Sequence, residues 1–220
     1  MILFKKNSDE GVKVVSPPNL GWLEKKLSEK EMDYVWKCID NRKKESYKSH
    51  LAGNITESNE LSDKSDWFFI NTLKPLCIVY GEKFGNLGDS FPSTVKHPYY
   101  LKSWWVNYQK QHEFNPTHDH GGIYSFVIWM KIPTRYSEQV KNYISNNSNE
   151  KSKTVSNFSF LYTDILGKTR GQIYKMDPEM ESTLLFFPSN LYHQVYPFYN
   201  CDEDRISVSG NISLNTTKVL

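Results

Sequence analysis

Short runs of aromatic and β-branched residues dominate the chain from about residue 95 onward. The runs follow one another as YYLKSWWVNYQK, GIYSFVIWMKIP, VSNFSFLYTDIL, STLLFFPS and RISVSGNISL, with Pro, Gly, Asn and Asp between them. Such residues favour strands, and runs of this length bounded by turn-forming residues are typical of sheets. We therefore predict that residues 95–215 fold into one compact system of β-sheets.

The first part of the chain has helical patterns instead. Ser28 and Glu31 have the spacing of a capping box, and the apolar residues that follow repeat on one helical face, which predicts a helix over residues 29–43. A second helical pattern runs through DWFFINTLKPLCIVYGEKFG, where Pro75 requires a kink or a break. Residues 1–94 are therefore expected to form a mostly helical region that supports the sheets.

The length of 220 residues fits one domain with a substantial buried core. The polar stretch SEQVKNYISNNSNEKSKTVS separates two predicted strands, which indicates an inserted surface loop over about residues 134–156. This loop could act as a lid over a site or could be disordered. We expect a single domain over residues 1–220, mainly β with flanking α-helices.

Charge and cysteine content narrow the class of partner and the compartment. Lys and Arg number 27 against 25 for Asp and Glu, so the charge of +2 gives no basic field that would indicate nucleic acid. No run approaches the length of a membrane span, and MILFKKNSDE has only four apolar residues before charge begins, too few for a signal peptide. Three widely spaced cysteines fit a reducing compartment. We expect a soluble cytoplasmic protein.

The stretch NPTHDHGG holds two histidines one residue apart. On an extended chain the side chains of His118 and His120 lie on the same face, so both imidazoles can reach a common metal ion while Asp119 points away. Chance pairs of this kind are common, so a metal site needs a third ligand. His193 is the candidate, because it follows the apolar run LLFFPS at the start of another extended segment.

The strand RISVSGNIS carries a basic residue where a buried face is expected. Arg205, Ser207 and Ser209 share one face, and the isoleucines and valine share the other. A buried arginine needs an anion or a carboxylate, because an unpaired buried charge is very costly. The alternative is an ordinary salt bridge, with Asp202 or Glu203 as the partner.

The order H-x-H, a long gap, a histidine near a strand end and then R-x-S resembles the iron(II)- and 2-oxoglutarate-dependent dioxygenases. The resemblance is strongest to small oxygenases of that superfamily from bacteria and marine bacteriophages, in which NPxHxHG-type and FPSxxxH…RxSxSxN segments recur. Here they stand as NPTHDHG and as FPSNLYH followed by RISVSGN, and the resemblance covers residues 95–215. HLAGNI at residues 50–55 also resembles a segment ahead of the core in the phage members.

The resemblance implies a fold and a set of roles. The fold would be a double-stranded β-helix, a jelly-roll or cupin-like barrel with N-terminal helices before it. His118, His120 and His193 would hold Fe(II), with 2-oxoglutarate and dioxygen at the remaining positions. Arg205 would bind the far carboxylate of 2-oxoglutarate, with a hydrogen bond from Ser207. The aromatic side chain of Tyr108 is a further candidate contact to the cosubstrate, with core packing as the alternative.

One departure from the superfamily pattern leaves the ligand set open. The usual motif is H-x-D or H-x-E, whereas this chain has His120 at the acidic position, and Asp119 could reach the metal only through a bulge or turn. Three-histidine sites also occur in cupin dioxygenases that use no 2-oxoglutarate, which is the alternative enzyme. A non-catalytic β-barrel that binds a ligand is the alternative without turnover.

The resemblance also implies a reaction. 2-Oxoglutarate would be oxidised to succinate and carbon dioxide while a C–H bond of a second substrate is hydroxylated. A peptide, with proline as the first residue to consider, and a small molecule are both candidate substrates. The pocket should be apolar, with Trp104, Trp105, Trp129 and Tyr124 as candidate walls or simply core residues. A homodimer is possible, because aromatic N-terminal helices could pack on a second copy.

Overall fold

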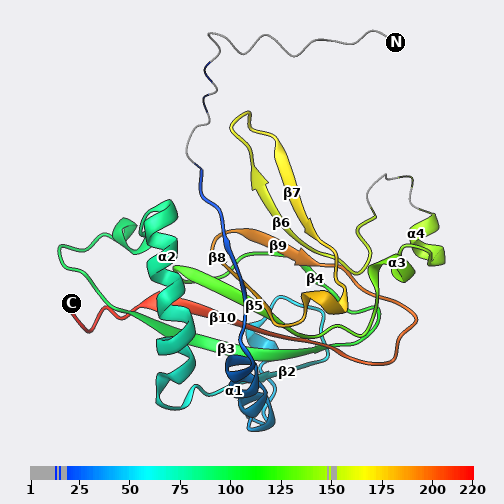
Figure 1. Cartoon of the computed structure of the whole chain (residues 1–220), viewed down its shortest axis with the longest axis horizontal. Helices are drawn as coiled ribbons and strands as arrows, with labels where there is room; N and C mark the ends of the chain where they lie inside the picture. Colours follow the sequence, from blue (N-terminus) through cyan, green and yellow to red (C-terminus); the bar gives the residue numbers. More distant parts are fainter. Residues whose placement is uncertain (1–12, 14, 16–18, 148, 150–152) are drawn as a thin grey trace.

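Two antiparallel β-sheets face each other in the computed structural model of the chain, which describes residues 13, 15, 19–147, 149 and 153–220 (Figure 1). The larger sheet has six strands, in the order β1 (Leu23–Lys26), β8 (Thr183–Pro188), β5 (Tyr124–Lys131), β10 (Arg205–Leu214), β3 (Tyr99–Gln109) and β2 (Glu57–Glu60). The smaller sheet has four strands, in the order β4 (Asn115–His118), β9 (Tyr192–Val195), β6 (Phe158–Thr163) and β7 (Thr169–Tyr174).

The chain moves back and forth between the two sheets. Strands β3, β5, β8 and β10 belong to the larger sheet, and β4, β6, β7 and β9, which alternate with them along the chain, belong to the smaller one. This alternation is the topology of a jelly roll, in which two sheets close on one core. The structure confirms the prediction of a mainly β protein with a double-stranded β-helix core and flanking helices.

Burial on both faces explains why the central strands are apolar throughout. In β5, Phe126 and Ile128 belong to the core beneath the helices, while Val127 and Trp129 belong to the core between the two sheets. Successive side chains of a strand point to opposite faces, so a strand covered on both sides needs apolar residues at every position. The larger sheet is therefore the middle layer of three.

Two helices cover the outer face of the larger sheet. Helix α1 spans Glu29–Asp40, which confirms the helix predicted over residues 29–43. Residues Phe69–Leu73 form a π-helical turn that continues into α2 (Lys74–Phe84). Pro75 follows this π-helical turn closely, so the helical segment accommodates the proline with a local irregularity and does not end there.

The N-terminal region also supplies two strands that the sequence patterns do not indicate. Strand β1 pairs with β8 and strand β2 pairs with β3, each at an edge of the larger sheet. Their sequences, LEKK and ESNE, are short and charged. Edge strands commonly carry charge, which blocks further strand pairing, and such strands lack the apolar alternation by which strands are recognised.

A buried acidic residue links α1 to the π-helical turn before α2 and to β1. Glu31 accepts hydrogen bonds from Lys25 Nζ at 2.6 and 2.7 Å, from Thr72 Oγ1 at 2.7 Å, and from Ser28 N at 2.9 Å. Ser28 and Glu31 form the predicted capping box. Burial alone would raise the pKa of Glu31, but the hydrogen bonds outweigh it and lower the pKa from 4.5 to about 2.

We predict that Glu31→Gln removes a pH-dependent part of the stability. A carboxyl group whose pKa falls on folding stabilises the folded state above its unfolded pKa, and this contribution disappears as the pH falls from about 4.5 toward 2. The variant should lose on the order of 2 kcal/mol at pH 7 and roughly half of that or less at pH 3. Urea denaturation at both pH values measures this, with Glu29→Gln, at an exposed position of the same first turn, as control. Equal losses at both pH values would contradict the prediction.

The region predicted as an inserted polar loop contains two short helices, α3 (Tyr136–Gln139) and α4 (Tyr143–Asn146). The buried side chain of Gln139 donates to Tyr199 O at 2.8 Å and accepts from Tyr199 N at 2.9 Å, which ties α3 to the segment after β9. The returning end of the region is buried at Ser156 and Asn157. The remaining short helical segments are 3-10 turns at Lys48–His50, Lys64–Asp66, Leu87–Ser90 and Pro178–Met180.

The described residues bear on only some of the remaining sequence-based expectations. Over the described part of the chain, no helix has the length and apolar character that a membrane crossing requires. Cys38, Cys77 and Cys201 are free thiols, and the first two are buried. The segment MILFKKNSDE, considered above as a signal peptide, lies outside the described residues.

Candidate metal centre and the cavity beside it

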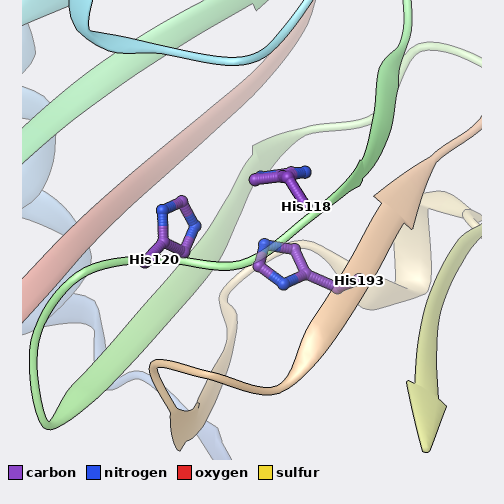
Figure 2. A group of neighbouring side chains, drawn as sticks. All are labelled: His118, His120 and His193. Atoms are coloured by element: carbon purple, nitrogen blue, oxygen red, sulfur yellow. The ribbon is translucent and has the colours of Figure 1, made fainter.

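Three histidines converge at one end of the small sheet (Figure 2). Strands β4 and β9 pair antiparallel with His118 directly opposite His193. His120 lies two residues beyond the end of β4, where its backbone N–H donates to Ser189 O at 2.8 Å. One ring nitrogen from each residue lies within 4.8 Å of the other two, a spacing at which the three could hold one metal ion.

Backbone carbonyls fix two of the imidazoles. His118 Nδ1 lies 2.7 Å from Pro116 O, and His193 Nδ1 lies 2.9 Å from Leu191 O. A carbonyl only accepts, so in both rings Nδ1 carries the proton and Nε2 keeps its lone pair for a metal. The His120 ring packs edge-on against Trp105, with 5.8 Å between the ring centroids.

Burial keeps these imidazoles neutral. It lowers the pKa of His118, lowers the pKa of His120 to about 4, and lowers the pKa of His193 well below its ordinary value. The neighbouring histidines lower the pKa of His193 further, because a second positive charge at this distance is unfavourable. Neutral imidazole is the form that binds metals, so the three residues are in the ligating state at neutral pH.

The structure brings His120, and not Asp119, into the cluster. Asp119 is exposed, while the group of potential metal ligands found among the described residues consists of the three histidines. Strand β4 ends at His118, and the carboxylate of Asp119 lies outside the group of potential ligands. The geometry therefore agrees with the interpretation that the side chains of His118 and His120 lie on the same face of the chain.

Arg205 is the other unusual group of the barrel. It is 1 % exposed at the start of β10, and its guanidinium lies over the Phe198 ring at 4.9 Å. Nη2 donates to Ser156 Oγ, whereas Nε and Nη1 are buried without a hydrogen-bond partner. Burial lowers the pKa of Arg205 to about 9, so the group stays charged at neutral pH. Two unsatisfied donors on a buried cation indicate a place for an anion.

The alternative of an ordinary salt bridge for this arginine is not found. Glu203 instead accepts from Lys131 Nζ at 2.7 Å, and Asp202 accepts from Gln111 Nε2 at 2.7 Å. Among the described residues, no carboxylate lies within ion-pair distance of Arg205. Ser207 is half-buried two residues farther along the same strand.

Tyr108 does not face the histidines, which corrects its assignment as a cosubstrate contact. It packs against the core beneath the helices, and the Arg42 guanidinium lies over its ring at 5.1 Å. The neighbouring Asn107, which the sequence analysis did not select, is buried and lines the cavity described below. Trp104 and Tyr124 also belong to the core under the helices, and Trp129 belongs to the core between the sheets.

A cavity of about 350 Å³ opens beside the histidines. One wall is the inner face of β3, which contributes Trp105 and Asn107. Residues of the segment 47–55, which includes the HLAGNI motif, also line the cavity. His118 and His120 line one end of the cavity, so a molecule bound there would lie beside the metal position. Of the four aromatic residues considered as pocket walls, Trp105 takes that role.

The HLAGNI segment is held tightly against the strand that leads to His118. Asn54 N donates to Phe114 O at 2.9 Å, and the Thr56 N–H donates to Glu113 Oε1 at 2.9 Å. A Cβ atom on Gly53 would lie 1.8 Å from Asn115 Oδ1, so a larger residue would require the Asn115 side chain to move. The sequence shows this glycine but does not indicate the close contact, which forms between segments far apart in the chain.

We predict that Gly53→Ala disturbs the metal centre as well as the fold. The added methyl group must displace Asn115, the first residue of the strand that ends at His118, at a cost of roughly 1–3 kcal/mol. Thermal denaturation should show the destabilisation, and a Co(II) titration should show weaker binding. Gly171→Ala is the matched control, since its Cβ would meet Leu161 at an ordinary 3.7 Å. Unchanged cobalt affinity in Gly53→Ala would contradict the claim that the segment positions His118.

Comparisons with known proteins agree with this geometry. The family described as "Putative 2OG-Fe(II) oxygenase" matches residues 103–211. A prolyl-4-hydroxylase from Pseudomonas putida is similar in structure, with a TM-score of 0.52, 11 % identity and coverage of 89 % of this chain and 94 % of that one. A prolyl hydroxylase from Trichoplax adhaerens, solved with a hypoxia inducible factor peptide fragment, has a TM-score of 0.50 and 12 % identity, with coverage of 87 % and 82 %. No curated protein matches the sequence.

A double-stranded β-helix with three imidazoles at one end is an arrangement that suits a non-haem metal oxygenase, which agrees with the family match. The matched residues contain all three histidines and Arg205. The chain belongs to the superfamily of Fe(II)- and 2-oxoglutarate-dependent oxygenases. Iron(II), 2-oxoglutarate and dioxygen are the cofactor and cosubstrates of this enzyme class.

Proposed function

We propose that the protein hydroxylates a C–H bond of a second substrate while 2-oxoglutarate is converted to succinate and carbon dioxide. The observation that carries this proposal is one buried arrangement: three neutral imidazoles within 4.8 Å, and a charged arginine in the same barrel with unsatisfied donors. The histidine cluster fits a divalent metal, and Arg205 fits a carboxylate. Bound Fe(II) supplies the activation of dioxygen.

His118, His120 and His193 are the proposed iron ligands. Three protein ligands leave open positions on the metal for the cosubstrates, as in facial triads. With no carboxylate in the set, the iron site keeps one more positive charge than a site with two histidines and one acid. This charge favours the anionic cosubstrate. The Nδ1 hydrogen bonds of His118 and His193 hold the rings in position to ligate.

We predict that metal-binding measurements will distinguish the role of His120 from that of Asp119. Alanine at His118, His120 or His193 should weaken Co(II) binding by at least about 100-fold, because each removes one of three ligands. Asp119→Asn should change the affinity by less than about threefold, because the carboxylate is exposed and outside the cluster. Anaerobic titrations followed by the cobalt absorption bands measure both. Strong loss in Asp119→Asn with retention in His120→Ala would reverse the assignment.

Arg205 is the proposed partner of the distal carboxylate of 2-oxoglutarate. Its free Nε and Nη1 donors can bind a carboxylate with two parallel hydrogen bonds. Ser207, two residues along the strand, is the proposed additional hydrogen-bond donor. Tyr108 has no place in this proposal, since it lies on the other face of β3.

We predict opposite effects of Arg205→Met on stability and on cosubstrate binding. Removal of a buried charge that lacks a partner should stabilise the protein without ligand by about 1–3 kcal/mol. Removal of the carboxylate partner should weaken 2-oxoglutarate binding by about 100-fold. Thermal denaturation and calorimetric titration of the Mn(II)-loaded protein measure the two effects. Arg170→Met, which removes an exposed arginine, should leave cosubstrate affinity unchanged. Unchanged affinity in Arg205→Met would contradict the assignment.

The substrate is proposed by class. Peptidyl proline is the first class to test, because the prolyl hydroxylases named above share the fold, and small molecules are the second. The direct experiment supplies Fe(II), 2-oxoglutarate and dioxygen, and measures succinate alone and with proline-containing peptides. Succinate that depends on Arg205 supports the proposal. Iron binding without succinate would favour one of two alternatives: a three-histidine dioxygenase that uses another cosubstrate, or a non-catalytic barrel. The first stays a candidate because the ligand set contains no acidic residue.

The compartment and the assembly state are also proposals. The free state of Cys38, Cys77 and Cys201 is consistent with the cytoplasm, in a host cell if the source is a virus. A homodimer is the proposed assembly, and size-exclusion chromatography with light scattering would measure the mass that tests it.

A further inference from the structure

The cavity beside the histidines has an uneven distribution of charge. Lys48, His50 and Lys102 line it, whereas Asp119 is its one acidic residue among the described lining residues. Asp119 adjoins His118 and His120, so the acidic group belongs to the metal end. Neither lysine forms an ion pair within the described part of the chain. Segment 47–55 and β3, which both line the cavity, therefore carry basic groups without acidic partners.

An irregularity of β3 accounts for the position of Lys102. The pairing of β3 with β10 shifts register between Asn211 and Ile212, whose partners are Ser103 and Leu101, so Lys102 is the extra residue of a bulge. A bulge changes the direction of a side chain relative to a regular strand. Both Lys102 and Ser103 consequently line the cavity, which consecutive residues of a regular strand would not do.

A series of aromatic ring contacts connects His50 with His120 of the histidine cluster. Tyr47 lies 4.9 Å from His50 and 5.7 Å from Trp105, measured between ring centroids. Trp105 in turn lies 5.8 Å from His120. A substrate could therefore lie on one face of aromatic contacts, with one end at the basic groups and the other end at the histidines.

The polar side chains of the cavity offer both donors and acceptors. Asn107 Oδ1 accepts from Ser58 Oγ at 2.7 Å, and the amide N–H groups of Asn107 remain available to a bound molecule. Asn211 uses both ends of its amide, since Oδ1 accepts from Ser125 Oγ at 2.8 Å and Nδ2 donates to Ser103 Oγ at 3.3 Å. Among the described residues, Asn115 Oδ1 is a buried acceptor without a partner. The preference for an anion therefore rests on the lysines, to which Asn107 can add a donor.

We infer that this cavity binds the substrate through an anionic group, a carboxylate or phosphate, held by Lys48, His50 and Lys102 while the carbon to be oxidised lies toward the histidines. The orientation of the substrate, with its reacting carbon toward the histidines, rests on the proposed function. The anion site itself does not. A volume of about 350 Å³ is at the lower limit for small-molecule sites, so the bound portion has the size of a small acid or of an acidic side chain with its neighbour.

Three fluorinated probes of one shape test the charge preference. They are 4-fluorobenzoate, 4-fluorobenzyl alcohol and 4-fluorobenzylammonium, and the readout is fluorine line broadening by the protein without metal. The anionic probe should bind most strongly, and binding should weaken as salt is added. Charge reversal in the double variant Lys48→Glu/Lys102→Glu should reduce its affinity by about tenfold. Lys83→Glu, an exposed position in the last turn of α2, is the matched control.

A second measurement places the bound anion. With Mn(II) and saturating 2-oxoglutarate, the fluorine of 4-fluorobenzoate should relax faster in the wild type than in the double variant, because it lies near the metal. Equal broadening of the three probes, or no effect of the double variant, would overturn the inference whether or not metal binds. Failure of Mn(II) or 2-oxoglutarate to bind would instead count against the proposed function.

Two arms of a turnover assay distinguish the sources of the anion. One arm adds small aromatic and aliphatic acids, and the other adds proline peptides with Glu or Gln next to the proline. Stimulation of succinate formation in either arm should be weaker in the double variant than in Lys83→Glu. Stimulation that is equally strong for the Gln peptides and for uncharged analogues of the acids would contradict an anion-selective cavity.

Discussion

The pairing of β4 with β9 is the constraint on which the site depends. It places His118 opposite His193, although the two residues are far apart in the sequence. His120 then joins them because its backbone N–H is held by Ser189 O, at the end of β8. The ligand set thus uses two strands of the small sheet and a turn fastened to the large one. Any change that separates the two sheets at this end also separates the proposed iron ligands.

The site is built at the expense of local stability. Three imidazoles are held neutral in a desolvated cluster, and Arg205 is buried as a cation without a carboxylate. Buried groups of this kind destabilise a fold until a ligand satisfies them. The apolar faces of the large sheet, packed against α1 and α2 on one side and the small sheet on the other, offset this cost. Binding of metal and cosubstrate should therefore stabilise the whole barrel.

Much of the site could be predicted from the sequence because it depends on residue types with few other uses. The H-x-H pair, His193 and the strand that carries Arg205 all lie where the motifs place them, and the strands of the core follow their aromatic and β-branched runs. The assignment of Tyr108 failed for a specific reason. Apolar residues occur on both faces of β3, so its alternation does not show which face is inward. The walls at 47–55 and the polar edge strands have no periodic signal, because close contacts such as that of Gly53 with Asn115 form only in the folded chain.

The central claim is that iron held by the three histidines and Arg205 together bind 2-oxoglutarate. The most direct measurement is an anaerobic titration of the Fe(II)-loaded protein with 2-oxoglutarate, followed by visible absorption. A weak metal-to-ligand charge-transfer band should appear in the wild type and in Asp119→Asn. It should be absent in His193→Ala, and in Arg205→Met it should require a much higher concentration of 2-oxoglutarate. Iron binding to the wild type with no band at any concentration of 2-oxoglutarate would contradict the account.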